Sequence, residues 1–162
     1  MKIIKDKLAL LAMLIALTTV LALTFIFPVP MTKGYVNFLE VGIYTAAMLL
    51  GGPAGAIVGG ISGGMLDLIL GYPQWLIFSV VIHGTQGYVA GKWSGNKQNV
   101  TRIFFLLLAS VIMIVGYFVA ATFLYGKVAG IASIFGNIIQ NVFGVIISMI
   151  IIKILDRLKI IN

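Results

Sequence analysis

Three carboxamide side chains lie close together near the C-terminus of this sequence, within an apolar stretch. Asn137, Gln140 and Asn141 are spaced by three and four residues, which places them on one face of a helix. Carboxamides carry both hydrogen-bond donors and acceptors, as recognition of a heterocyclic ligand requires. Hydrogen bonding between helices would explain each of them singly as well as ligand contact does. The cluster as a whole favours a polar cavity.

Two carboxylates and the single histidine also lie in or beside apolar stretches. Carboxylates such as Glu40 and Asp67 are costly inside a bilayer and are usually functional there. For Asp67, near a helix end, interfacial solvation is an alternative explanation. His83 shares a helical face with Ser79 and Gln86. It would be either a neutral histidine bonded to a neighbouring helix or a ligand contact.

Aromatic residues flank the turn that follows Asp67. Tyr72 and Trp75 would suit the aromatic belt at a membrane interface. They would equally suit a stacking wall for an aromatic ligand. Tyr44 and Tyr117 lie within the apolar segments 38–50 and 103–125 and are further candidates for stacking.

A serine between glycines allows a competing enzymatic interpretation. Residues 60–64 match the G-x-S-x-G pattern, so Ser62 and His83 could be the nucleophile and base of an intramembrane serine hydrolase. That pattern needs a strand–turn–helix context, which a glycine-rich helix does not provide. Residues 51–60 also lack the lysine of a phosphate-binding loop. We therefore expect no catalytic residue and no cofactor, with any ATP used by partner subunits.

Composition identifies lipid as the main solvent of this chain. Apolar residues make up 61% of the 162 positions and charged residues 9%, whereas soluble domains carry about 25% charged residues. The sequence therefore predicts an all-α integral membrane protein, with residues 1–162 in a single domain. The absence of cysteine and the single histidine argue against a metal site.

Six apolar segments are long enough, or nearly long enough, to cross a bilayer. The first is expected to be a retained helix and not a cleaved signal peptide, because it has the length to span. Prolines and glycines separate several of the segments. The expected helices are residues 8–27, 38–50, 54–70, 74–93, 103–125 and 128–155.

The second helix is too short to span. Its 13 residues would cover about 20 Å of a hydrocarbon core that is about 30 Å thick. The preceding outer loop, residues 29–37, must then reach into membrane depth, where non-helical backbone needs protein or a watery cavity around it. The sequence thus predicts a loop at membrane depth beside a cavity near residues 35–40.

Basic residues are distributed unequally between the two sides of a six-helix arrangement. Nine of the 11 lysines and arginines fall on the side that holds both termini, which predicts cytoplasmic N- and C-termini. The net charge of +7 is therefore a topology signal, and contact with lipid headgroups is favoured over nucleic acid. Because Arg102 and Arg157 are both on that side, the outer half lacks a guanidinium for an anionic ligand. A neutral or weakly basic ligand is favoured.

The motifs in residues 34–40, 49–56, 58–60, 67–72 and 82–92 together resemble the substrate-binding S-components of energy-coupling factor (ECF) vitamin transporters. They are most similar to the riboflavin-transporter-related branch, which includes S-components assigned to pyridoxine or hydroxymethylpyrimidine. Glu40 replaces the aspartate usual in that branch, and His83 stands where lysine often occurs. Residues outside 34–92 match only in hydropathy and length.

This resemblance implies a substrate site near the outer face, a lid between the first two helices, and location in the plasma membrane of a prokaryote. It also implies a membrane T-component and two cytoplasmic ATPases as partners. Ala12 and Ala16 form a small-x-x-x-small patch suited to close helix packing, and the resemblance implies that this patch docks on the T-component.

These observations favour a high-affinity binding subunit for a small aromatic vitamin or precursor, a vitamin B6 vitamer or hydroxymethylpyrimidine. The alternatives are riboflavin or another vitamin, the serine hydrolase, and a structural membrane subunit without ligand. The expected substrate contacts are Asn37, Glu40, Tyr44, Asp67, Trp75, His83, Gln86, Tyr117, Asn137, Gln140 and Asn141.

Overall fold

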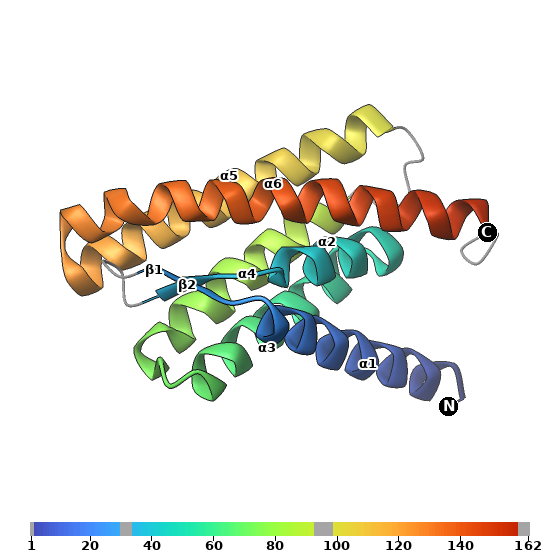
Figure 1. Ribbon diagram of the computed structural model, residues 1–162. Coiled ribbons are helices and arrows are strands. Elements are labelled where there is room, and N and C mark those ends of the chain that lie inside the picture. The colour runs from blue at the N-terminus through green and yellow to red at the C-terminus, as the bar shows by residue number, and fades with distance from the viewer. Residues whose placement is uncertain (1, 30–33, 93–98, 159–162) are drawn as a thin grey trace.

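The computed structural model describes residues 2–29, 34–92 and 99–158 of the chain. This part of the chain forms six helices, joined by turns and one small β-hairpin (Figure 1). Successive helices alternate in direction, so the start of the first helix and the end of the last lie at the same end of the bundle (Figure 1). The elements are α1 (Lys2–Thr24), β1 (Phe27–Val29), β2 (Gly34–Val36), α2 (Leu39–Leu50), α3 (Gly52–Ile69), the 3₁₀ helix η1 (Pro73–Trp75), α4 (Leu76–Gly91), α5 (Asn99–Tyr125) and α6 (Lys127–Arg157).

The stretch expected to be an irregular loop is partly a β-hairpin. β1 pairs antiparallel with β2, with Phe27 opposite Val36 and Pro28 opposite Tyr35. The first helix therefore ends at Thr24, earlier than the expected residue 27, because Phe27 and Pro28 already belong to a strand. Lys33 lies outside the described residues.

Other helix boundaries also differ from the expectation. α3 begins at Gly52, because Pro53 lies in its first turn, where its missing N–H breaks no helical hydrogen bond. The preceding Gly51 has a φ of 92°, a conformation that favours glycine. α1 and α5 begin earlier than expected, at Lys2 and Asn99. The expected fourth helix begins with the separate turn η1.

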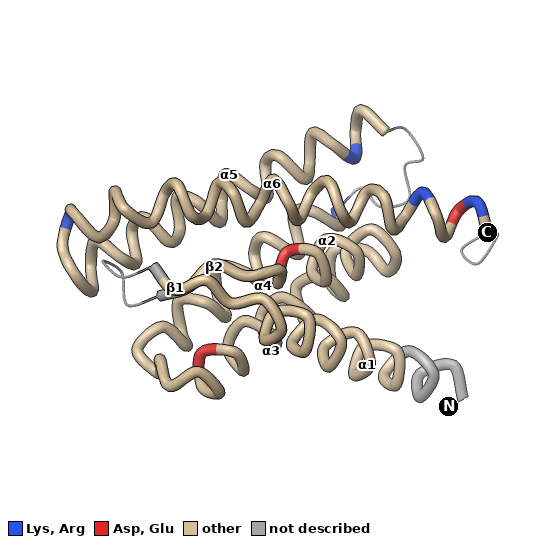
Figure 2. The backbone as a smooth tube through the Cα atoms, in the orientation of Figure 1, with Lys and Arg blue, Asp and Glu red and all other residues tan. Residues whose placement is uncertain are grey.

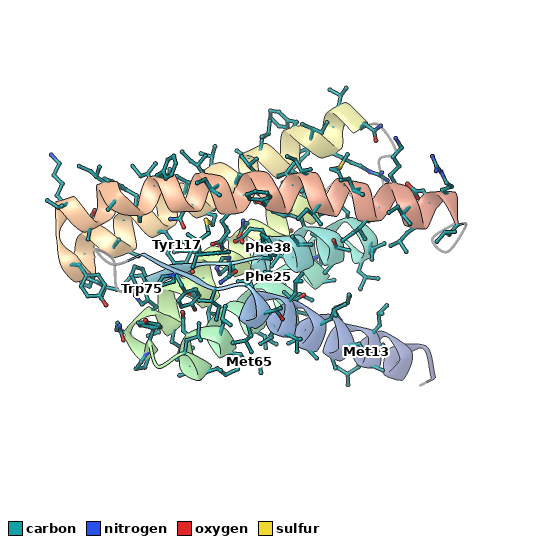
Figure 3. All side chains as sticks on the ribbon, in the orientation of Figure 1. Met13, Phe25, Phe38, Met65, Trp75 and Tyr117 are labelled. Carbon is teal, nitrogen blue, oxygen red and sulfur yellow. The ribbon has the colours of Figure 1, made fainter. Side chains whose placement is uncertain are left out.

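The outer surface of the bundle is strongly apolar. Within the described residues, α3, α5 and α6 are long and apolar enough to cross a membrane, whereas Leu8–Thr24 of α1 and Leu39–Leu50 of α2 are apolar but shorter. Met13 and Met65 lie on this surface (Figure 3). Because water would penalise so much exposed apolar area, the surface suits lipid.

The short helix α2 lies at the centre of the bundle, packed against α1, α3, α4 and α6. Most of its residues are buried, among them Ile43, Tyr44 and Ala47. At about 1.5 Å per residue, its 12 residues span only about 18 Å. The hairpin adjoins its N-terminal end (Figure 1). A non-helical segment therefore precedes the truncated helix.

Glycines bring α3 and α4 into close contact. A side chain at Gly55 would collide with the backbone of Gly87, and one at Gly59 would collide with the carbonyl of His83. These α3 glycines therefore serve close packing of the two helices. This packing fixes the position of His83 relative to α3.

Charged residues of the described chain gather mainly at the end that holds both termini (Figure 2). Lys92 directly follows α4, Arg102 lies near the start of α5, and Lys153 and Arg157 lie near the end of α6. Lys127 begins α6 at the opposite end. Two acidic residues, Glu40 and Asp67, lie within the bundle (Figure 2).

Candidate functional site

A cavity opens at the end of the bundle where the hairpin lies, between β2 and helices α2 to α6. The centre of a water molecule can occupy about 50 Å³ of it, several times the 10–15 Å³ or so that one water needs. Its total empty volume, including the part open to the outside, is about 560 Å³. It is lined by Tyr35, Val36, Asn37, Leu39, Gly63, Leu66, Asp67, Trp75, Ser79, His83, Met113, Tyr117, Ser133, Asn137 and Gln140.

The structure divides the eleven expected contact residues into two groups. Seven line the cavity: Asn37, Asp67, Trp75, His83, Tyr117, Asn137 and Gln140. The other four lie behind its wall, where they are buried among the helices: Glu40, Tyr44, Gln86 and Asn141.

The four residues behind the wall include three that form one hydrogen-bonded network. Asn141 Nδ2 donates to the backbone carbonyl of Asn137 at 2.8 Å, which directs Asn141 Oδ1 the other way. Oδ1 then accepts from Gln86 Nε2 at 3.1 Å and from the Tyr44 hydroxyl at 2.5 Å. Tyr44 also lies 2.9 Å from the Ser110 hydroxyl. The network therefore holds α2, α4, α5 and α6 together.

The same chain of hydrogen bonds fixes the tautomer of His83. Gln86 Nε2 donates to Asn141, so the other amide atom, Gln86 Oε1, faces His83 Nδ1 at 2.8 Å. Because Oε1 can only accept a hydrogen bond, His83 Nδ1 must carry the proton. His83 Nε2 therefore accepts from the Tyr117 hydroxyl at 2.9 Å. Tyr117 in turn accepts from the Ser79 hydroxyl at 2.7 Å. The proton of Ser79 is thus already engaged.

Glu40 lies deeper than the cavity and is fully buried. Its carboxylate is 3.5 Å from His83 Nδ1. Neither oxygen has a hydrogen-bond partner within the described part of the chain. A buried charge without hydrogen bonds is destabilising.

Asp67, at the end of α3, connects the hairpin to the helices. The Tyr35 hydroxyl donates to Asp67 Oδ1 at 2.6 Å. Burial and the neighbouring Asp67 carboxylate raise the pKa of the Tyr35 hydroxyl well above its ordinary value. The hydroxyl therefore stays protonated and remains a donor. Asp67 Oδ2 is buried and has no partner among the described residues.

Trp75 forms an aromatic wall with Tyr117. Its ring centroid is 5.7 Å from that of Tyr117, and the Tyr117 ring is 5.4 Å from His83. Both labelled side chains lie at the hairpin end of the bundle (Figure 3). Trp75 is buried and lines the cavity, a position that suits stacking better than an exposed interfacial belt. The side chain of Tyr72 is only partly buried.

Asn37 and Gln140 tie the segment after the hairpin to α6. The backbone N–H of Asn37 donates to Gln140 Oε1 at 2.9 Å, and Asn37 Oδ1 accepts from the N–H of Leu39 at 2.7 Å. The amide groups of both side chains are consequently left as donors. The hairpin is thus attached to α3 through Tyr35 and to α6 through Asn37.

Several lining residues were not expected as contacts. Tyr35 could have been suspected, because it lies two residues before Asn37 in the segment predicted to border a cavity. Ser79 and Ser133 share the polar faces of α4 and α6, so their spacing carried a signal. Val36, Leu39, Leu66 and Met113 are apolar, and no local pattern separates them from ordinary core residues.

The geometry does not assemble a serine hydrolase. The Ser62 hydroxyl donates to the backbone carbonyl of Ile15 in α1 at 3.4 Å. His83 makes its hydrogen bonds with Gln86 and Tyr117. The motif lies in the middle of helix α3, where its glycines serve packing.

The cavity lining contains one carboxylate, that of Asp67, and no lysine or arginine among the described residues. Within that part of the chain, no three His, Cys, Asp or Glu side chains gather as a metal site would require. The lining therefore suits an aromatic molecule that donates hydrogen bonds and carries no negative charge.

A family model described as "ECF-type riboflavin transporter, S component" matches residues 2–157. The chain belongs to this family. It is a multi-pass membrane protein of an ECF transporter and belongs to a family of transport components, not enzymes. Membership implies a T component and ATPase partners, with a vitamin as the cargo.

Two relatives of this S component cover most of its length. It is 39% identical over 157 residues, 96% of the chain and 91% of the relative, to "Thiamine precursor transporter HmpT" of Lactococcus lactis subsp. cremoris (strain MG1363). It is also 37% identical over 121 residues, 74% of the chain and 81% of the relative, to "Uncharacterized protein in gap 3'region" of Pyrococcus woesei.

Proposed function

We propose that this S component captures hydroxymethylpyrimidine, a thiamine precursor, in the cavity beneath the hairpin. The observation that carries the proposal is the cavity itself, lined by the aromatic rings of Trp75 and Tyr117, by carboxamides and by a single carboxylate. The ring faces suit a small planar heterocycle, and the polar groups suit its nitrogens and hydroxyl. Similarity to a thiamine precursor transporter supports the choice.

A vitamin B6 vitamer is the second candidate. It is also a small, weakly basic heterocycle with a hydroxymethyl group, and the same aromatic wall would accept it. Riboflavin is a weaker candidate because its ring system and ribityl chain are much larger than a single pyrimidine, and because a relative over most of the chain is named as a thiamine precursor transporter.

Calorimetric titration of the purified full-length chain in detergent tests the proposal. We expect hydroxymethylpyrimidine to bind with one-to-one stoichiometry and more tightly than pyridoxine or riboflavin. Tighter binding of pyridoxine would transfer the assignment to vitamin B6. Failure of all three compounds to bind would refute the proposal of a vitamin site in this cavity.

We further propose that both termini are cytoplasmic and that α1 docks on the T component, which works with two cytoplasmic ATPases. The basic residues at the terminal end of the bundle support this orientation (Figure 2). Ala12 and Ala16 are exposed on α1, so their small side chains allow another helix to approach closely.

Ala12→Trp and Ala16→Trp test the docking surface. A bulky ring there would hold the partner helix away while leaving the cavity unchanged. We expect uptake of radiolabelled hydroxymethylpyrimidine into cells to be lost, with calorimetric affinity retained. Leu17→Trp, which is exposed on another side of the same helix, serves as the matched control. Normal uptake by both alanine variants would contradict the docking proposal.

A further inference from the structure

Two residues that line the cavity, Asp67 and Trp75, each have one buried polar atom without a partner in the described part of the chain. These atoms are Asp67 Oδ2 and Trp75 Nε1. Their side chains are 3% and 4% exposed, so bulk water does not satisfy them. Other buried polar atoms without partners belong to Thr19, Glu40 and Thr45, none of which lines the cavity. An unsatisfied buried group is destabilising, which makes these two atoms candidates for ligand contact.

A compact turn of the backbone brings the two residues close together. The N–H of Tyr72 donates to the carbonyl of Asp67 at 2.7 Å, and the N–H of Trp75 donates to the carbonyl of Tyr72 at 2.9 Å. This compact turn connects the end of α3 to η1. Trp75 and Tyr117 lie at that end of the bundle (Figure 3).

Within the described residues, no hydrogen bond is formed to the free oxygen of Asp67, Oδ2. Tyr35 already donates its hydroxyl proton to the other oxygen, Oδ1. The Ser79 hydroxyl donates to Tyr117, because Tyr117 must donate to His83 Nε2. Asp67 Oδ2 can therefore accept a hydrogen bond from a donor on the ligand. Trp75 Nε1 can only donate a hydrogen bond, so its partner on the ligand must be an acceptor.

We propose that Asp67 and Trp75 together select a heteroaromatic ring that carries an amino donor beside a ring-nitrogen acceptor, as an aminopyrimidine does. The amino group donates to Asp67 Oδ2, and the ring nitrogen accepts from Trp75 Nε1. A second amino hydrogen remains for an amide oxygen such as that of Asn137, whereas a hydroxyl has only one hydrogen. A weakly basic ring also suits a carboxylate that no lysine or arginine in the described lining neutralises.

This inference rests on the proposed function, and a change in the ligand tests it without altering the protein. The probes are hydroxymethylpyrimidine and its analogue in which hydrogen replaces the amino group, titrated calorimetrically against the full-length chain. We expect the analogue to bind roughly tenfold to a hundredfold more weakly, because a hydrogen bond to a charged group is lost. Equal affinities would overturn the inference while leaving the proposed function intact. If neither compound binds, the proposed function fails, and the inference fails with it.

Variants then assign the effect to the two side chains. Asp67→Asn keeps an acceptor for Tyr35 but presents an N–H group to the ligand amine. It should weaken binding of hydroxymethylpyrimidine roughly tenfold or more and change binding of the deamino analogue by less than about threefold. Trp75→Phe should weaken both compounds, since both retain the ring nitrogen. Equal losses of both compounds in Asp67→Asn would overturn the assignment of the amino group to Asp67.

Asp156→Asn and Tyr88→Phe are the matched controls. Asp156, near the end of α6, pairs with Arg102, near the start of α5, at 3.9 Å. Tyr88 is exposed on α4. Neither lines the cavity, so both variants should bind the two compounds with wild-type affinity. A loss in Asp156→Asn equal to that in Asp67→Asn would attribute the effect to general loss of negative charge and overturn the inference.

Discussion

The cavity wall and the network behind it use similar polar side chains in opposite ways. In the network, the amides of Gln86 and Asn141 and the hydroxyl of Tyr44 are hydrogen-bonded to one another. In the wall, Asp67 Oδ2 and Trp75 Nε1 are buried without partners among the described residues. The difference indicates that these two atoms of lining residues, unlike the paired groups behind the wall, are free to bond a ligand.

The two asparagines of α6 should give the largest contrast between these regions. Asn141→Ala leaves the Gln86 amide and Tyr44 hydroxyl without their shared acceptor. We expect a loss of about 2 kcal/mol in the free energy of unfolding, or a melting temperature lower by roughly 4–8 °C. Asn137→Ala, whose side chain lines the cavity, should leave the melting temperature within about 2 °C and weaken ligand binding. Thermal unfolding in detergent and calorimetry measure the two effects, and a reversed pattern would break the contrast.

Tyr117 belongs to both regions, because it bonds to His83 and Ser79 and also lines the cavity. Tyr117→Phe keeps the ring but removes the hydroxyl. It should lower the unfolding free energy by about 1 kcal/mol and weaken ligand binding several-fold, since the released Ser79 proton can then compete for nearby acceptors. A variant that loses only stability, with unchanged affinity, would assign Tyr117 to the network alone.

Tyr35→Phe tests the attachment of the hairpin to α3. Loss of the bond to Asp67 should accelerate ligand release roughly tenfold, as measured by stopped-flow displacement, with little change in melting temperature. Because the pKa of Tyr35 is raised in the attached state, attachment is fully stabilised below the ordinary tyrosine pKa of about 10 and weakens as pH rises further. The wild-type release rate should therefore increase above about pH 10, and this part of the increase should be absent in Tyr35→Phe.

Glu40→Gln should have the smallest effect, and in the stabilising direction. The Glu40 carboxylate is fully buried without a hydrogen bond in the described structure. A neutral amide of the same size removes the desolvation penalty of the charge. We expect the melting temperature to rise by roughly 2–4 °C. A clear decrease would show that the carboxylate is paired in the folded protein and would place it in the network.

Helical periodicity and membrane energetics were sufficient to predict much of this fold. Six segments, the truncated α2 and the inward faces of α4 and α6 follow from hydropathy and from spacings of three and four residues. The hairpin was not predicted, because its strands are only three residues long and contain a proline, which normally weakens a strand prediction.

The candidate site was less predictable than the fold. Spacing placed Gln140 and Asn141 on one face, but only the structure shows that Gln140 lines the cavity while Asn141 lies behind it. That distinction depends on which neighbouring helix meets each side chain, and a single helix does not contain this information. Leu66 and Met113 were missed because an apolar wall has the same sequence pattern as an apolar core.

A structure of the full-length chain with bound hydroxymethylpyrimidine tests the central claim most directly. We expect the pyrimidine ring beneath the hairpin, against Trp75 and Tyr117, with its amino nitrogen about 3 Å from Asp67 Oδ2. A ligand bound instead in the apolar groove of Phe27, Val36 and Phe143, or on the outer helix surface, would contradict the account.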